Sequence, residues 1–307
     1  MTAVPVKRKK AKRRDIVFPI VNTLILFLIM FLTLYPVINT VAYSFNDGMD
    51  ALRGGIGLWP RVFSTDAYDS LLKDPAVYKA FGISVSKAAL TTLLNLFFTS
   101  MLAYALSRKE YVLRKFITVI LVLTMYINAG LIPNYLLVGK FLGLRNTYWV
   151  YIIPTMFSCF NMIVIRTYIG GLPDALVESG KIDGAGDIRC FFQIILPLCL
   201  PVLATVALFV AVGAWNSWFD TYLYNGSKKD LYSMQYLLKM KLATTQNQAS
   251  NAAASTSEAL AATQKAKTTP VTVRSAITVI SAVPILVVYP FLQKYFVTGM
   301  ALGSVKG

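Results

Sequence analysis

The most informative sequence pattern lies in a short charged segment between two apolar stretches. It runs from Glu178 to Pro197 and reads E-S-G, three residues, Gly184, nine residues, I-x-L-P. Before it, Pro173 suits the first position of a helix, and Asp174 and Glu178 would place carboxylates at that helix's positive end. Gly184, followed by Gly186, permits a sharp change of direction. The spacing therefore predicts a helix, a glycine turn and a second helix.

The second helix is expected to begin near Asp187 and to run to Pro197 with an apolar face. Two short helices joined at a turn form a knob that can seat in a cleft of another protein and transmit a push. The alternative is an ordinary amphipathic loop at the membrane surface. The residues assigned to the knob are Glu178, Asp183, Gly184, Ala185, Ile194, Leu196 and Pro197.

Catalytic and metal-binding patterns are missing from the sequence. The chain contains no histidine, which removes histidine-based triads and zinc-protease motifs. The nearest approach to a phosphate-binding loop, Gly180-Lys181, lacks a glycine five residues earlier and is followed by Ile182 where Ser or Thr is needed. The three cysteines show no C-x-x-C spacing. We therefore expect no enzyme activity, no metal site and no ATP hydrolysis by this chain itself.

Amides beside aromatic residues suggest a path for an uncharged, hydroxyl-rich solute. The strongest group is Trp215, Asn216 and Trp218, because tryptophans three apart on a helix share a face. An indole can stack on a sugar ring while an amide binds hydroxyls. The alternative is that these tryptophans anchor the helix at the interface and that the amides tie helices together. Weaker candidates on neighbouring stretches are Tyr126, Asn128, Phe160 and Asn161.

Charged residues of the apolar stretches are expected near the ends of these stretches, with none clearly at mid-depth. They are Lys87, Arg166, Asp220 and Arg274. Because an ion-coupled transporter usually carries an ionisable group near the midplane, this distribution argues against ion coupling.

The elements that must position these residues are membrane helices. Of the 307 residues, 56% are hydrophobic, and each long apolar stretch has the roughly 20 residues that cross a hydrocarbon core. The predicted fold is all-α, a polytopic membrane protein with six transmembrane helices. The stretches are 16–41, 80–106, 115–138, 148–169, 198–221 and 271–296.

Basic residues set the expected orientation. Seven Lys and Arg lie between residues 7 and 14, and four more lie between residues 108 and 115, after the second stretch. By the positive-inside rule these belong in the cytoplasm, which places the N-terminus, the knob and the C-terminus there. The net charge of +16 is thus mainly a topology signal, and no pattern of basic residues with stacking aromatics indicates nucleic-acid binding.

The chain resembles the carbohydrate permeases of ABC importers of the maltose-permease class, and within them the branch for oligosaccharides and uronate-containing glycans. The knob resembles that family's coupling signature, E-A-A-x3-G-x9-I-x-L-P, with Ser179 and Gly180 in place of the alanine pair. The resemblance covers nearly everything after the basic N-terminus. It includes GLWPRVFSTDAY (57–68), GLIPNYLLVGKFLGLRNTYW (130–149), AVGAWNSWFD (211–220) and LQKYFVTGMALGSVKG (292–307).

This resemblance implies the type I importer permease fold and a plasma-membrane machine. Its other parts would be a second permease in a heterodimer, two ATP-binding subunits that use ATP and Mg, and an extracytoplasmic solute-binding protein. It implies no cofactor bound by this chain. It further implies that Glu178 pairs with an arginine of the ATPase, and that the tail with Lys306 and Gly307 reaches toward the ATPase dimer.

The expected organisation is a basic cytoplasmic N-terminus (1–15), a six-helix permease domain (16–297) and a cytoplasmic tail (298–307). The permease domain contains the coupling loop (170–197) and a long outer loop (222–270). The stretch 242–270, rich in Ala, Thr, Ser and Gln, is either a solvated or loosely helical linker or a loop that contacts the binding protein. Two other functions stay open: a permease of the same architecture for a non-sugar solute, and a membrane scaffold that transports nothing.

Overall fold

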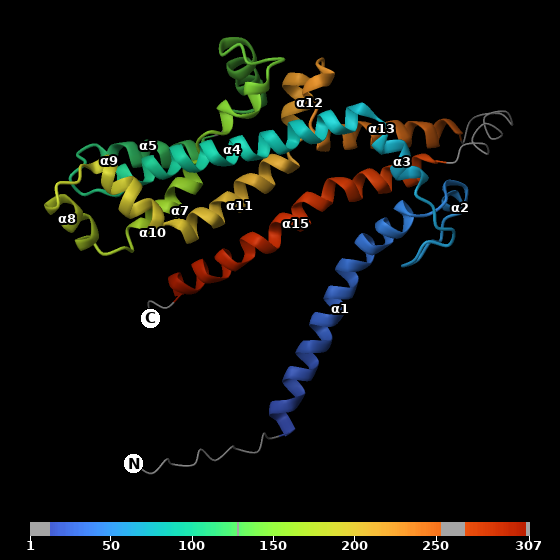
Figure 1. The fold of residues 1–307 in the computed structure, drawn as a ribbon, viewed down its shortest axis with the longest axis horizontal. Coiled ribbons are helices and arrows are strands. Elements are labelled where there is room, and N and C mark those ends of the chain that lie inside the picture. Colours follow the sequence, from blue (N-terminus) through green and yellow to red (C-terminus); the bar gives the residue numbers. More distant parts are fainter. Residues whose placement is uncertain (1–12, 128, 253–267, 305–307) are drawn as a thin grey trace. The chain divides into compact units, whose positions relative to one another are not determined.

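The structure is a computed structural model that describes residues 13–127, 129–252 and 268–304 (Figure 1). Within these ranges the regular structure is helical, and extended pairing is limited to an isolated bridge between Asn46 and Phe63. The all-α prediction is confirmed. By its contacts the chain divides into two units, residues 1–70 with 254–279 and residues 71–253 with 280–307.

Helices of membrane-spanning length appear where the apolar stretches predict them. In the described residues, three helices are long and apolar enough to span, and three further pairs meet the same test as bent spans. The single helices are Val17–Ser44, Pro75–Ser107 and Pro270–Pro290. The pairs are Arg114–Tyr126 with Leu131–Phe141, Tyr148–Thr155 with Cys159–Ile169, and Asp187–Leu198 with Leu200–Asn216. Counting each bent pair as one span gives the six that the sequence predicts.

The first unit contains α1 (Arg13–Ser44), α2 (Gly48–Leu52), most of α3 (Asp66–Leu72) and the start of α15 (Pro270–Ser304). The Asp47 side chain caps α2 by accepting hydrogen bonds from the N–H groups of Met49 and Asp50. Arg61 holds the loop after α2 through an ion pair with Asp50 of 3.0 Å. These contacts order the short connection that follows the first apolar helix.

The second unit is organised around α4 (Pro75–Ser107), which packs against α7 (Cys159–Ile169) and α11 (Leu200–Asn216). Asp74 caps the start of α4 and Pro75 occupies its first turn. The remaining helices of this unit are α5 (Arg114–Tyr126), α6 (Leu131–Tyr135), η1 (Leu136–Phe141), η2 (Tyr148–Tyr151), η3 (Ile153–Thr155), α8 (Ala175–Ile182), α9 (Asp187–Cys190), η4 (Phe191–Ile195), α10 (Leu196–Leu198), α12 (Phe219–Asn225), η5 (Lys229–Leu231) and α13 (Met234–Ala252).

The largest buried apolar cluster of this unit joins α4, α7 and α11 to the predicted knob. Figure 1 shows α8 and α9 at the end of the bundle formed by these helices. The buried members are Ala103, Tyr104, Leu106, Met162, Ile165, Ile169, Val177, Cys190, Phe191, Ile195, Cys199, Val202, Leu203 and Val206. Because α8, α9 and η4 contribute to the same core as the long helices, the knob is packed onto the bundle and does not hang from it as a free loop.

One expectation needs correction in the outer part of this unit. The fifth stretch was expected to be helical to residue 221, but α11 ends at Asn216, Ser217 is extended and α12 begins separately at Phe219. The stretch after residue 222 contains α13 to Ala252, whose start is held when the N–H of Met234 donates to Ser84 Oγ at 2.8 Å. Residues 253–267 lie outside the described part of the chain.

Candidate functional site

The glycine turn of the knob is a helix stop of defined geometry. Gly184 has φ +81°, a conformation that costs other residues free energy. Its N–H donates to the carbonyl of Lys181 at 3.0 Å, and the N–H of Ala185 donates to the carbonyl of Gly180 at 2.9 Å. This pair of bonds is the Schellman motif, which satisfies the last carbonyls of a helix. The turn between α8 and α9 is therefore where the sequence predicts it, and it is built as expected.

Several residues of the signature face the core of the bundle. Ala185, Ile194 and Leu196 are partly buried and pack against the apolar cluster. Gly180 is buried, and a Cβ added there would lie 2.6 Å from Ile194 Cδ1. Gly180 thus lets α8 approach η4 closely. The π-helical turn η4 leads through Pro197, which is exposed, into the bend before α11.

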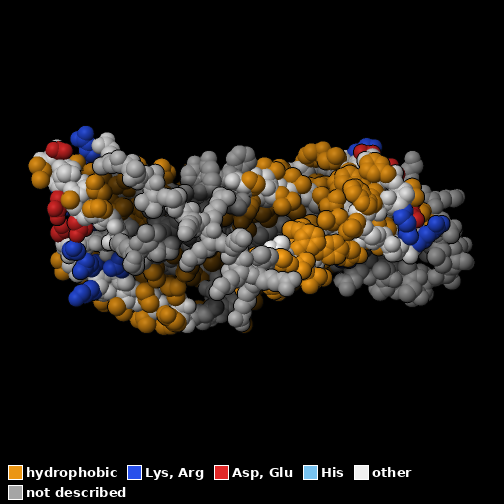
Figure 2. Space-filling view, turned by 90° about the horizontal axis from the view of Figure 1, so that it is seen from below, with side chains coloured by type: hydrophobic (Ala, Val, Ile, Leu, Met, Phe, Trp, Pro, Cys, Tyr) orange, Lys and Arg blue, Asp and Glu red, His pale blue; other side chains and the backbone are white. Residues whose placement is uncertain are grey.

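The opposite face of the knob is open to solvent. Glu178 and Asp183 are exposed, and so are two large apolar side chains, Ile182 at 86% and Ile188 at 77%. Figure 2 shows acidic, basic and hydrophobic side chains together at the end that carries α8 and α9. Carboxylates beside exposed isoleucines suit contact with another protein.

A surface ion pair ties this knob to the loop after α4. Lys109 Nζ lies 2.8 Å from Asp174 Oδ2, and both side chains are largely exposed. The hydrogen bond and charge of Lys109 hold the pKa of the Asp174 carboxyl below its usual value. Asp174 in turn raises the pKa of Lys109. Lys306 and Gly307, predicted to reach the ATPase, lie outside the described residues.

A cavity with a mixed polar and apolar lining and a volume of about 450 Å³ lies among α4, α7, α11 and the residues of η2 and η3. It has the size of a small-molecule site. Its lining consists of Lys87, Thr91, Asn95, Tyr151, Pro154, Thr155, Phe157, Ser158, Asn161, Phe209, Val210, Gly213, Ala214, Ser217 and Asp220.

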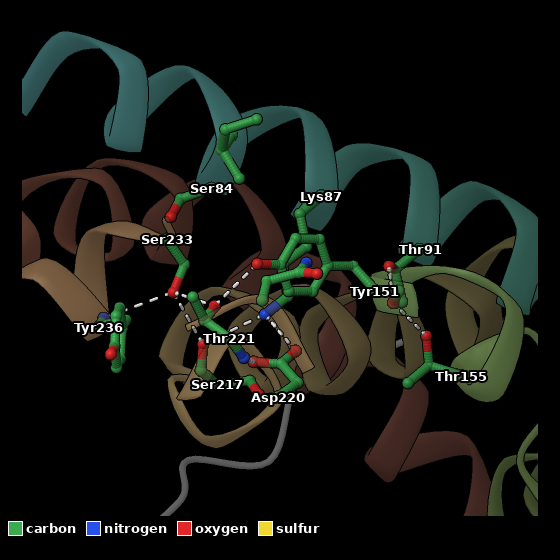
Figure 3. A network of polar contacts seen from close by, with 12 residues as sticks. Ser84, Lys87, Thr91, Tyr151, Thr155, Ser217, Asp220, Thr221, Ser233 and Tyr236 are labelled. Carbon is green, nitrogen blue, oxygen red and sulfur yellow. Dashed lines mark hydrogen bonds and ion pairs between the residues drawn. The ribbon is translucent and has the colours of Figure 1, made fainter. Parts of the chain in front are cut away.

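The cavity contains a part-buried ion pair between Lys87 and Asp220 (Figure 3). Lys87 Nζ lies 2.5 Å from Asp220 Oδ2, and their side chains are 2% and 22% exposed. Lys87 Nζ also donates to the carbonyl of Ser217 at 3.1 Å and sits 4.6 Å from the centre of the Tyr151 ring. The sequence analysis names Lys87 and Asp220 as charges near the ends of their apolar stretches but does not predict that they pair.

Amides and hydroxyls continue the polar lining away from Lys87. Asn161 Nδ2 donates to Asn95 Oδ1 at 3.2 Å, and Asn95 Nδ2 donates to the carbonyl of Thr155 at 2.8 Å. Thr91 donates to the carbonyl of Tyr151 at 3.4 Å. The cavity therefore presents one ammonium, one carboxylate and a row of neutral polar groups.

Most residues predicted for a solute path lie elsewhere. Trp215 is 5% exposed, its ring meets the edge of Phe81 and its Nε1 donates to the carbonyl of Ser281 at 3.0 Å. Because α11 ends at Asn216, Trp215 and Trp218 do not share a helix face, and that part of the prediction is wrong. Asn216 is exposed, and Lys239 Nζ lies 3.6 Å from the centre of the Trp218 ring.

Asn161 is the predicted residue that does line the cavity. Phe160 and Tyr126 are 55% and 83% exposed and do not line it. Asn128 lies outside the described residues.

A periodic signal in the sequence could have located the cavity. Ser84, Lys87, Thr91, Asn95 and Thr99 follow one another at steps of three or four residues, and all are buried in the structure. Such spacing places polar groups on one face of a helix, and polar residues of membrane helices face the protein interior or a water-filled cavity. This spacing of polar residues is visible in the sequence alone.

Comparison with known proteins gives consistent matches. Residues 95–302 match the family model "Binding-protein-dependent transport system inner membrane component". The polygalacturonan/rhamnogalacturonan transport system permease protein YtcP of Bacillus subtilis is 36% identical over 284 residues, covering 92% of this chain and 96% of that protein. Protein LplC of the same organism is 37% identical over 292 residues, covering 95% of each.

A solved structure shares the fold over nearly the whole chain. It is the crystal structure of a bacterial ABC transporter involved in the import of the acidic polysaccharide alginate, with a TM-score of 0.83 and 28% identity. The match covers 94% of this chain and all of that one. The fold and these matches thus define a membrane permease subunit of the ABC importer class and not an enzyme. The chain belongs to the family of inner-membrane components of binding-protein-dependent transport systems.

Proposed function

We propose that this permease subunit forms, with a second permease subunit, the path by which an ATP-driven importer carries oligosaccharides across the plasma membrane. The observation that carries the proposal is the cavity of about 450 Å³, whose amides and hydroxyls match sugar hydroxyls. The carbohydrate named for YtcP and the alginate named for the structural relative support this substrate class.

Two ATP-binding subunits and an extracytoplasmic solute-binding protein complete the proposed machine. The exposed face of the knob, with Glu178 and Asp183, docks in a cleft of the ATPase, where Glu178 pairs with an arginine. Gly184 and Ala185 shape this face, and the tail with Lys306 and Gly307 extends toward the ATPase dimer. ATP and Mg are used by the partner subunits, and this chain binds no cofactor.

The proposed orientation places the N-terminus, the knob and the C-terminus in the cytoplasm. Ser179→Cys in the knob and Trp59→Cys in the loop after α2 test it, because both positions are exposed. The variants are made in a chain whose three native cysteines are replaced by serine. A membrane-impermeant maleimide should label Trp59→Cys in intact spheroplasts and Ser179→Cys only after permeabilisation. The reverse pattern contradicts the orientation.

Transport is tested in proteoliposomes that contain the assembled permeases and ATPase. Labelled oligosaccharides, amino acids and phosphate are supplied outside with the solute-binding protein, and Mg-ATP is enclosed. We expect oligosaccharide uptake that needs both the binding protein and internal ATP. Uptake of an amino acid or phosphate with no uptake of any glycan would reject the carbohydrate assignment. A transporter with an inactive ATPase serves as the control.

A further inference from the structure

The buried charge in the cavity is the feature that the assignment as a sugar permease leaves unexplained. Neutral sugars need hydroxyl partners, which Thr91, Asn95 and Asn161 supply, but they need no ammonium. Placing charge inside a membrane protein is costly, and such residues are usually functional. A buried ion pair is also weak evidence of stability, because apolar side chains of similar volume often stabilise as well or better. The Lys87–Asp220 pair therefore calls for a role beyond packing.

The two partners of the pair are held unequally. Asp220 keeps a second donor, since the N–H of Thr221 lies 2.8 Å from its Oδ1, and its side chain is 22% exposed. Lys87 is 2% exposed and meets Asp220, the carbonyl of Ser217 and the face of Tyr151. Figure 3 shows these groups converging on its ammonium from separate elements. Asp220 can thus release Lys87 and stay hydrogen-bonded, whereas Lys87 needs an anion beside it.

We propose that Lys87 is the carboxylate-binding residue of the solute path and that it takes the carboxylate of a uronic-acid unit in exchange for Asp220. The inference rests on the proposed function and narrows its substrate to acidic oligosaccharides. The hydroxyls of the bound glycan form hydrogen bonds with the amides and hydroxyls that line the cavity beyond Lys87. Asn95 lies eight residues further along α4, about 12 Å at 1.5 Å per residue.

The exchange of Asp220 for a glycan carboxylate suits a transport path because the free energies lost and gained in it are nearly equal. One ion pair is broken and one is formed, and the hydration lost by the glycan carboxylate is offset by hydration gained at Asp220. A solute in a conduction path must bind well enough to enter and weakly enough to leave. A free buried ammonium would hold the acid too tightly, and a neutral cavity would offer no charge to replace the water that the carboxylate loses.

The substrates of similar proteins agree with this chemistry. Alginate is described as an acidic polysaccharide in the solved structure of the related transporter. Polygalacturonan, named for the related permease, is a polymer of uronic acids. Among the described residues, Lys87 is the cationic side chain that lines the cavity.

The test uses the purified complex of permeases and ATPase without the binding protein, so that discrimination by the binding protein does not enter. Binding of labelled trigalacturonate is compared with binding of its methyl ester, which has the same length and no charge. The wild type should bind the acid about tenfold or more tightly than the ester. In the variant Lys87→Gln/Asp220→Asn, which keeps polar groups at both positions, affinity for the acid should fall to that for the ester.

Two further variants separate ligand binding from structure. Lys87→Arg should retain the preference for the acid, and Asp220→Asn should bind the acid more tightly while lowering the maximal uptake rate. Equal losses for acid and ester, or an unchanged preference in the neutral double variant, would overturn the proposal and leave the pair as a structural tie. If wild-type proteoliposomes with binding protein import no glycan, the proposed function fails instead.

Discussion

Replacing Gly184 by alanine should weaken coupling through backbone strain alone. Its φ of +81° lies in the left-handed region, and nothing lies within 4 Å of an added Cβ. No steric clash therefore complicates the substitution. Holding a residue other than glycine in this conformation costs about 1–2 kcal/mol. Gly184→Val should cost more, because β-branched residues are true outliers at positive φ.

The strain at residue 184 should change the shape of the exposed face of the knob that is proposed to dock on the ATPase. Relief of the strain requires a right-handed turn, which breaks the bonds from Gly184 to Lys181 and from Ala185 to Gly180. If the ATPase binds the wild-type turn, 1–2 kcal/mol should reduce its apparent affinity about 5–30-fold. Gly184→Asn should fall between wild type and Gly184→Ala, because asparagine tolerates this conformation better than alanine does.

The assay is ATP hydrolysis stimulated by the loaded binding protein, measured while the ATPase subunit is titrated onto permeases in nanodiscs. The matched control is Gly186→Ala, since Gly186 has φ −71° and open space around an added Cβ. Membrane levels of all variants should equal wild type because the turn is exposed. Identical titration curves for Gly184→Ala and Gly186→Ala would refute the argument from backbone strain.

Four further predictions concern other parts of the second unit. Glu178→Ala should lower ATPase affinity by about 1.5–3 kcal/mol at unchanged membrane level; normal transport contradicts the docking role. The purified chain alone should hydrolyse no ATP, which a phosphate-release assay checks. Trp215→Phe, which removes the bond to Ser281, should lower stability by about 0.5–1.5 kcal/mol in thermal unfolding without changing glycan preference; a changed preference would return Trp215 to the solute path. Asp174→Asn should reduce the melting temperature by a constant amount between pH 5 and 9, roughly the window between the ordinary carboxyl and lysine pKa values. Because Lys109 lowers the Asp174 pKa, this contribution is lost only as pH falls below about 4, and loss near pH 6 contradicts the assignment.

Local features of the knob were predictable because short-range rules determine them. The position of Gly184 and the start of the second helix near Asp187 follow from turn and helix-start preferences that act within a few residues. The apolar stretches were predictable for a different reason, since the bilayer sets the length of a spanning helix. The turn preferences and the lengths of the apolar stretches both depend on residues that are close together in the sequence, and the structure agrees with both predictions.

The spacing of polar residues along α4 could have located the cavity, but its ion pair was not predictable because the two partners come from distant parts of the chain. Lys87 and Asp220 are 133 positions apart, and no local pattern shows that they meet. The end of α11 was also missed: an apolar run continues past Asn216, but Ser217 turns the backbone to an extended conformation. Trp215 contacts Phe81 and Ser281, and the face that Trp215 and Trp218 would share on a continuous helix does not exist.

The knob and the cavity charge lie at the two ends of one helix. The segment Asp187–Leu198 bends by 79° into α11, whose 17 residues span about 25 Å at 1.5 Å per residue. Ser217 follows directly, and Lys87 on α4 holds its carbonyl and the Asp220 carboxylate. Because a hydrogen bond is lost when its atoms separate to about 3.6 Å, a shift of about 0.5 Å at the end of α11 is enough to break the 3.1 Å bond from Lys87 Nζ to the Ser217 carbonyl. A tilt of α11 against α4 that shifts Ser217 by this much therefore removes one of the two polar partners that hold Lys87 beside α12.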